Sequence, residues 1–162
     1  MADSKLLQEL MDAAKVESEA YRRLLAVMNE HQDALLRQCP ESINEALQRN
    51  LASLESGKQA CNRRVEITRS LCKTLNIRIE EGSARIIACF QGDEMMALQE
   101  IYLELGQLGR EIQSQNERNR QMIEHSLDLL HGDFQALGQL AKKASNRREE
   151  DGGEGVILSL RA

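Results

Sequence analysis

Apolar or readily packed residues recur in alternating steps of three and four along the first part of the chain. The series is Leu7, Leu10, Ala14, Tyr21, Leu24, Met28, His31 and Leu35. Only Glu17 interrupts this spacing, which is the heptad spacing of helices that pack against other helices. The pattern continues to Cys39-Pro40, where proline disfavours helical backbone in the residue before it. The sequence therefore predicts a first helix from Asp3 to about Gln38, about 54 Å long.

A second helical pattern begins at Pro40, since proline is accepted in the first turn of a helix. Its seam runs through Leu47, Leu51, Leu54, Lys58, Cys61, Val65, Thr68, Cys72, Leu75 and Ile79. Only a few residues separate the two helices, and short connections join antiparallel neighbours. We expect the first two helices to form an antiparallel hairpin.

The pattern loses its regularity between about Asn76 and Asp93, where Gly82 and Gly92 punctuate it. The apolar residues from Ala84 to Phe90 are enough for one or two helical turns. We predict a linker that contains a short helix. The sequence leaves open whether this helix packs back on the bundle.

A third helix is predicted from Asp93, a typical capping residue, to about Lys143. Its seam is Leu98, Ile101, Leu105, Leu108, Ile112, Gln115, Asn119, Met122, Ser126, Leu129, Ala136 and Leu140. Gly106 and Gly109 lie inside this helix, where each glycine costs roughly 1 kcal/mol relative to alanine. They indicate either a close approach of another helix or simple tolerance in a well-packed element.

The sequence after Ala144 is charged and rich in glycine, and it cannot bury one face. A short apolar patch follows near the end of the chain, at Val156, Ile157, Leu158 and Leu160. We therefore expect a helical domain over residues 1–143 and a flexible charged linker with an apolar tail over residues 144–162.

The composition supports an all-α fold. Hydrophobic residues make up 41% of the chain but aromatic residues only 2%, as in long helices and coiled coils. Strands favour aromatic and β-branched residues in alternation, and no such run occurs before the last few residues. The expected architecture is an elongated antiparallel helical hairpin or bundle of three long helices, with a short linker helix and a flexible C-terminal tail.

Charge and hydropathy narrow the possible partners. The net charge is -5, so the chain as a whole offers no basic face for nucleic acid. The basic stretch Arg63, Arg64, Arg69, Lys73 and Arg78 is interpreted as a solvated helix face, with contact to phosphate or an acidic protein as the alternative. No apolar run approaches the length of a membrane span, and the first ten residues do not resemble a secretion signal. We expect a cytoplasmic protein.

The sequence carries no pattern for catalysis or for a cofactor. His31, His125 and His131 are isolated from one another, and Asp128 with His131 makes only one of the two Glu-x-x-His-like units that a di-iron bundle needs. The four cysteines match neither a metal clamp nor a disulfide framework, so we expect reduced thiols. Nucleophile, P-loop and dinucleotide motifs are absent. We predict a protein that is no enzyme and that holds neither metal nor cofactor.

Polar amides enter the third seam at Gln115 and Asn119. A polar group at a core position lowers stability but fixes register or partner choice. The alternatives are a buried amide that sets register, an exposed face where the bundle opens, and a contact with a partner.

The stretch Asn116-Glu-Arg-Asn-Arg-Gln-Met-Ile-Glu-His-Ser-Leu127 resembles the N-x-R-N-x-x-L-(hydrophobic)-x-x-S-L stretch of the FlgN family of flagellar export chaperones. The layout is also similar: a long first helix, a small polar break before Ile43 to Leu47, a second helix, an irregular linker and a long third helix with the motif. The resemblance covers roughly Leu6 to Leu140.

The resemblance implies a cytoplasmic chaperone that holds hook-associated (hook–filament junction) proteins by their C-terminal helical segments before secretion. It also implies contact with components of the flagellar export apparatus. An extended apolar helix face can accept an amphipathic helix of a partner as an added bundle member. The expected client site on the third helix comprises Asn116, Asn119, Met122, Ile123, Leu127, Leu130 and Leu137.

The apolar tail at Val156, Ile157, Leu158 and Leu160 is the second expected client contact, although it lacks the tyrosine-glycine ending often seen in the family. The competing interpretation is a coiled-coil scaffold or adaptor without a client groove. In that case the same heptads would seal a homodimer, and periodicity alone does not separate seams within one chain from seams between chains.

Overall fold

The computed structural model describes the backbone of residues 2–151, and their side chains except at 2, 3, 81, 82, 145 and 147–151. Its elements are α1 (Ala2–Arg37), α2 (Pro40–Leu75), the 3-10 turn η1 (Ile79–Glu81), α3 (Gly82–Ile87) and α4 (Gly92–Asp151). Residues 2–151 contain no strand, so the all-α prediction is confirmed. The boundaries of α1 and α2 lie within a few residues of those that the apolar pattern predicts.

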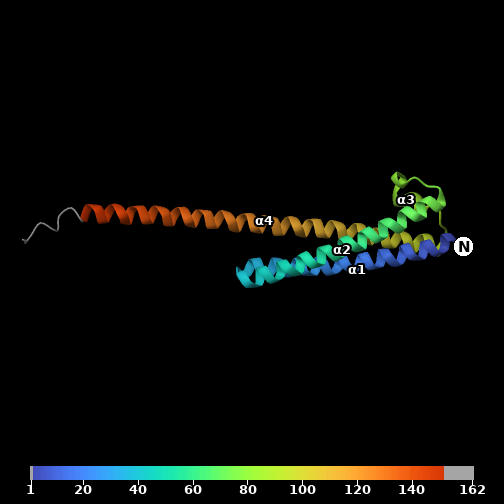
Figure 1. Ribbon diagram of the computed structural model, residues 1–162, viewed down its shortest axis with the longest axis horizontal. Helices are drawn as coiled ribbons and strands as arrows, with labels where there is room; N and C mark the ends of the chain where they lie inside the picture. Colours follow the sequence, from blue (N-terminus) through green and yellow to red (C-terminus); the bar gives the residue numbers. More distant parts are fainter. Residues whose placement is uncertain (1, 152–162) are drawn as a thin grey trace, which may run out of the picture. The chain divides into compact units, whose positions relative to one another are not determined.

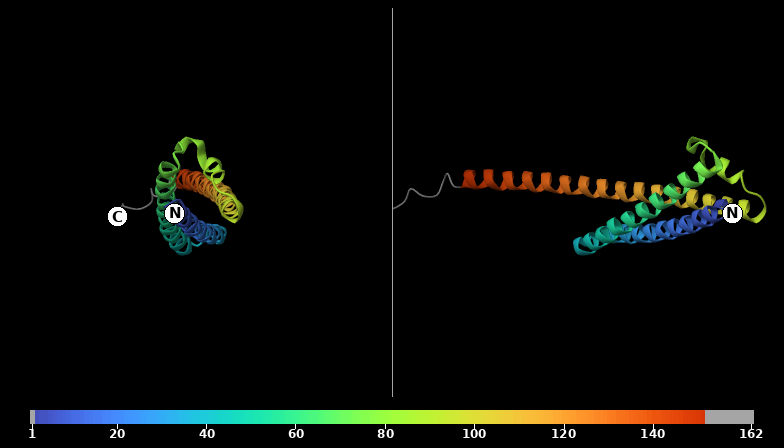
Figure 2. Two further views of the ribbon diagram at one scale, coloured as in Figure 1. Left: turned by 90° about the vertical axis from the view of Figure 1, so that its right-hand side faces the viewer. Right: turned by 45° about the vertical axis from the view of Figure 1, so that its right-hand side comes forward.

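Helices α1 and α2 form the predicted antiparallel hairpin, and Figures 1 and 2 show them side by side in opposite directions. α1 ends because Gln38 turns to a positive φ of 53° and Cys39 is extended before Pro40. α2 ends at Asn76, whose φ is also 53°. Asparagine is among the few residues that accept this left-handed backbone. The N–H of Ile77 then donates to the carbonyl of Cys72 at 2.9 Å, which satisfies one of the last carbonyls of the helix.

The linker helix α3 packs on the hairpin, which settles the question that the sequence left open. Ile86 is buried, and it shares a core cluster with Leu7 and Leu10 of α1, Leu71 of α2 and Leu98 of α4. Ile87 and Phe90 cover the outside of this cluster. The irregular stretch therefore closes one end of the helical core.

The first half of α4 completes the core and runs parallel to α1. Ile101 and Leu105 pack on Ala14, and further along both helices Asn119 reaches Met28. The side chains that fill this core are aliphatic, and the buried positions of α1 and α4 follow the predicted seams. Burial of apolar surface is the main force that joins these helices.

Helix α4 extends farther than predicted, to Asp151 and not to about Lys143. The expected flexible linker therefore begins within a helix, because alanine, arginine and glutamate between positions 144 and 151 are good helix formers. By its contacts the chain divides into two compact units, residues 1–120 and 121–162.

Gly106 and Gly109 mark no close approach of another helix. A Cβ at Gly109 would meet nothing within 4 Å, and one at Gly106 would meet only the end of the Arg110 side chain. The tolerance interpretation holds. Gly57 of α2 does lie against a neighbour, because a Cβ there would lie 3.4 Å from the ring of Tyr21.

Candidate functional site

The third predicted seam is buried only as far as Asn119. Leu98, Ile101, Leu105 and Leu108 are buried in the first unit, and the series ends with Gln115 and Asn119. Beyond Arg120 the described side chains of α4 are half-buried or exposed, although the same spacing continues. One periodic pattern thus covers two different environments.

Two amides form a buried polar network where the packed part of α4 ends. Gln115 Nε2 donates to Gln32 Oε1 at 2.7 Å and to Asn119 Oδ1 at 3.1 Å. Asn119 Nδ2 donates to the carbonyl oxygen of Met28 at 3.0 Å. Gln115 and Asn119 are 3% and 4% exposed, so these bonds are shielded from water. Of the three interpretations of these amides, the geometry fits a buried group that sets the register of α4 on α1.

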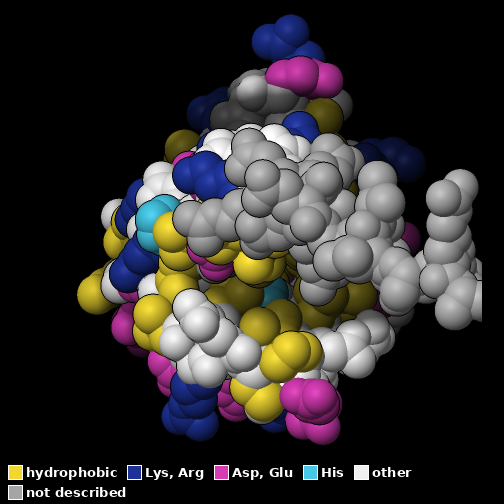
Figure 3. Space-filling model, turned by 90° about the vertical axis from the view of Figure 1, so that its left-hand side faces the viewer, with side chains coloured by type: hydrophobic (Ala, Val, Ile, Leu, Met, Phe, Trp, Pro, Cys, Tyr) yellow, Lys and Arg dark blue, Asp and Glu magenta, His cyan; other side chains and the backbone are white. Residues whose placement is uncertain are grey.

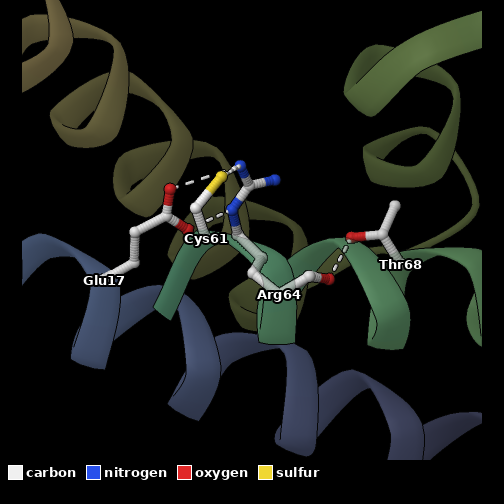
Figure 4. Close-up of polar contacts among 4 residues, drawn as sticks. All are labelled: Glu17, Cys61, Arg64 and Thr68. Carbon is white, nitrogen blue, oxygen red and sulfur yellow. Dashed lines mark hydrogen bonds and ion pairs between the residues drawn. The ribbon is translucent and has the colours of Figure 1, made fainter. Parts of the chain in front are cut away.

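A second polar cluster lies in the middle of the first unit (Figure 4). The Arg64 guanidinium of α2 forms an ion pair with the Glu17 carboxylate of α1, which is only 1% exposed. The guanidinium carbon also lies 5.8 Å from the ring centroid of Tyr102 on α4, within cation–π distance. The interpretation of Arg64 as part of a solvated face is therefore wrong. Glu17, which interrupts the first seam, supplies the anion that holds Arg64 in the core.

The titratable groups around this cluster respond to burial and to one another. Burial, followed by the hydrogen bond and charge of Glu17, raises the pKa of the Tyr21 hydroxyl. Burial alone would lower the pKa of Arg64, but the hydrogen bond and charge of Glu17 raise it. Tyr21 therefore stays neutral and Arg64 stays charged. The ion pair therefore joins α1 to α2, and the cation–π contact of Arg64 with Tyr102 adds α4.

His31 of α1 lies inside the first unit, and its Nδ1 is buried with no hydrogen-bond partner. Burial lowers its pKa below the ordinary value of 6.5. The imidazole is thus neutral at physiological pH.

The second unit exposes a continuous apolar series along α4. It comprises Ile123, Leu127, Leu130, Phe134, Leu137, Ala141 and Ala144, which we call the α4 stripe. Its five large side chains are between 39% and 68% exposed. Figure 3 shows one face of the molecule, on which hydrophobic side chains lie open to solvent among charged ones.

The spacing of the α4 stripe keeps its members on one side of the helix. Steps of four and three residues alternate from Ile123 to Ala144, and residues so spaced line one face. The opposite face carries Asp128, Gln135, Gln139 and Lys142. Met122, Leu129 and Leu140 widen the apolar face at its edge. The helix has the form of a bundle member, and no other described residue of this unit packs against its apolar face.

The predicted client residues fall into three groups. Ile123, Leu127, Leu130 and Leu137 belong to the exposed stripe, and Met122 is half-buried at its edge. Asn116 is exposed in the first unit, whereas Asn119 is buried and bonded to Met28. The tail residues Val156, Ile157, Leu158 and Leu160 lie outside the described residues.

The sequence interpretation missed Phe134, Leu129 and Leu140 as surface residues, and it missed the exposed leucines Leu47 and Leu51 of α2. Phe134 could have been found, because it continues the Ile123–Leu127–Leu130 spacing. The exposure of the α2 leucines has no signal in the sequence, since their spacing equals that of a buried seam.

No group of three His, Cys, Asp or Glu side chains that could hold a metal occurs among the residues that the structure describes. Within residues 2–151, no helix has the length and apolarity that a membrane span needs. All four cysteines are free thiols, and Cys72 is buried.

Comparison with known proteins gives one match. Neither the curated proteins nor the solved structures contain a significant match to the chain. The family model described as FlgN protein matches residues 1–154 of the 162. That match includes both helices of the hairpin, the linker, all of α4 and the motif from Asn116 to Leu127. The chain therefore belongs to the FlgN family of flagellar export chaperones.

Proposed function

We propose that this chain binds hook-associated (hook–filament junction) proteins in the cytoplasm before their export, and that the α4 stripe receives a C-terminal helical segment of the client. The observation that carries the proposal is the stripe itself: five large apolar side chains in heptad spacing, all exposed. Contiguous apolar side chains exposed to water mark sites where another protein binds. An amphipathic client helix would bury it as an added helix of a bundle.

The buried amide network is a second observation in support of the proposal. Its hydrogen bonds hold α4 against α1 as far as Asn119, and the α4 stripe follows that packed segment in the sequence. We assign the network to positioning and place client contact at Met122, Ile123, Leu127, Leu130, Phe134 and Leu137. Asn116 is exposed about two helical turns before Ile123 and remains a proposed contact. Asn119 is left out because its side chain is occupied inside the first unit.

The test is co-purification with hook-associated proteins of the same cell, followed by titration with the C-terminal helical segment of the captured client. Leu127→Asp places a charge in the middle of the stripe and is expected to weaken binding by about tenfold or more, since a buried unpaired charge costs more than ~1.4 kcal/mol. Gln135→Asp, on the opposite face of the same helix, is the matched control. Helical circular dichroism must survive in both variants.

If Leu127→Asp and the wild type bind the client segment with equal affinity, the α4 stripe is not the client site. No complex at all with any hook-associated protein would remove the client class. In that event the scaffold alternative, in which the heptads serve only helix pairing, would stand.

The apolar tail and the export apparatus are the two further proposed contacts. Deletion of residues 152–162 is expected to lower client affinity if Val156, Ile157, Leu158 and Leu160 fold against the client. Unchanged affinity would eliminate the tail. Contact with cytoplasmic components of the export apparatus is tested by the same pull-down with and without bound client.

A further inference from the structure

The third seam continues along α4 past the packed segment, and there a charge interrupts it at one position. This part of the seam runs through Met122, Ser126, Leu129, Ala136 and Leu140. The steps alternate between four and three residues, except for one step of seven from Leu129 to Ala136. Asp133 occupies the position that divides this step into four and three. The face that the seam shares with the α4 stripe therefore contains a carboxylate.

Asp133 lies among leucines of the apolar face. Residues three and four apart are neighbours on a helix surface, so Asp133 borders Leu129, Leu130 and Leu137. Its side chain is exposed, and none of the residues that the structure describes forms a hydrogen bond or ion pair with its carboxylate. A helix that covers these leucines would also remove the carboxylate from water.

The first seam contains the same kind of interruption, and there the carboxylate has a partner. Glu17 stands at a seam position of α1, and the helix packed against it, α2, supplies Arg64 as the cation. Glu17 is only 1% exposed. In this chain a seam carboxylate is thus buried together with a basic side chain of the covering helix. An apolar residue in place of that cation would leave a buried charge unpaired, which is strongly unfavourable.

We propose that Asp133 selects the client helix, by pairing with a lysine or arginine that this helix carries within its apolar face. The inference rests on the proposed function, because it takes the client's helical segment as the occupant of the α4 stripe. It adds the chemistry of that occupant: an amphipathic helix with a basic residue among its apolar contacts. A helix that is apolar throughout would bury Asp133 without a partner, and its binding is disfavoured for that reason.

The first test compares Asp133→Leu with the wild type in titrations with the C-terminal helical segment of the captured hook-associated protein. Because the substitution enlarges the apolar face, it would tighten binding if Asp133 were merely solvated. The pairing instead predicts binding at least about tenfold weaker, since the basic residue of the segment then loses its partner. Equal or tighter binding by Asp133→Leu overturns the proposal.

The matched control is Asp128→Leu, which removes the same charge from the opposite face of the same helix. It is expected to bind the segment as the wild type does. Helical circular dichroism has to be unchanged in both variants. Equal weakening by Asp128→Leu and Asp133→Leu would trace the effect to net charge and also overturn the proposal.

A charge exchange identifies the partner residue. Asp133→Lys is expected to weaken binding of the segment at least about tenfold, because two cations then meet at a covered position. Each lysine or arginine of the segment is changed to glutamate, one at a time. One of these segment variants should bind Asp133→Lys at least about tenfold more tightly than the unchanged segment does. Recovery by none of them, or equally by all of them, overturns the proposal.

Failure of this inference is separable from failure of the proposed function. If Leu127→Asp weakens binding of the segment while the Asp133 variants behave like the Asp128 control, the client lies on the α4 stripe and only the inference fails. If no segment binds, or if Leu127→Asp binds as the wild type does, the proposed function and the inference fail together. If the chain alone forms a dimer that the segment does not dissociate, a second copy covers the stripe, which also overturns the inference.

Discussion

Glu17 stands where the apolar series of α1 would place a leucine, and its carboxylate is almost fully buried beside Arg64. Such a pair contributes little net stability, because removing two charges from water offsets much of their attraction. The pair instead favours one alignment of the three helices, because the carboxylate comes from α1, the guanidinium from α2 and the ring of Tyr102 from α4. A shifted helix would leave a buried charge unpaired.

Arg64→Met is expected to lower the free energy of unfolding by about 3 kcal/mol or more, because Glu17 stays buried without its partner. Arg63→Met is the control on the same helix. Arg63 is two-thirds exposed, and its ion pair with Glu66 at 3.8 Å should be worth less than ~1 kcal/mol. Urea unfolding monitored by circular dichroism measures both. Equal losses in the two variants would mean that the buried pair has no special weight.

His31 predicts a pH dependence of stability. Burial lowers its pKa in the folded chain below the 6.5 of the unfolded chain, so the unfolded state binds more protons as pH falls. Stability is therefore unaffected by this group well above pH 6.5 and declines as pH falls through 6.5 toward the folded-state pKa. His31→Gln is expected to flatten this decline in urea unfolding curves collected across that range. An identical slope in the variant would exclude His31 as its source.

At the scale of elements, α4 shows how one heptad pattern serves two purposes. Up to Asn119 the seam packs on the hairpin, and there Gln115 and Asn119 replace apolar residues. Amides at seam positions bond only when the helices meet in one register, which favours the observed alignment of α4 with α1. After Asn119, large apolar residues occur in a second series that begins at Ile123 and forms the α4 stripe.

The amide network should be non-additive. Gln115→Leu alone leaves Asn119 Oδ1 buried without its donor, which costs roughly 1–3 kcal/mol. The double variant Gln115→Leu with Asn119→Leu removes both groups and is expected to be more stable than the single variant. A double-mutant cycle in urea should give a coupling of about 0.5–3 kcal/mol. Simple addition of the two single effects would contradict a shared network.

At the scale of the whole molecule, the buried core belongs to the first unit. The core clusters lie within residues 1–120, and no described side chain of residues 121–144 is buried. The described part of the second unit, residues 121–151, is helical and has no buried side chain among those described, so this helix is stabilised mainly by its own backbone hydrogen bonds. Helices without tertiary packing are marginal in water.

Amide hydrogens of residues 121–151 are therefore expected to exchange faster than those in the packed parts of α1, α2 and α4, as measured by mass spectrometry. Truncation after Arg120 should leave the unfolding midpoint of the first unit nearly unchanged. A large fall in that midpoint would show that the second unit contributes to the core. Added client segment should slow exchange in residues 121–151 if it binds the stripe.

The sequence by itself determined the helices, the hairpin and the family. Heptad spacing follows directly from helix geometry, proline at position 40 forces a break, and the motif from Asn116 to Leu127 is local in the chain. The predicted end of α4 at about Lys143 was wrong, because the charged residues that follow cannot bury a face but can still form a helix, which continues to Asp151.

Tertiary structure alone decided which seams are covered. Leu105 and Leu127 are both leucines in heptad spacing on one helix, yet one is buried and the other half exposed. Arg64 and Arg63 are adjacent arginines, yet only Arg64 faces Glu17, 47 residues earlier in the chain. Periodicity states which side of a helix is apolar, but burial depends on whether another helix lies there. That partner is set by contacts between residues distant in sequence.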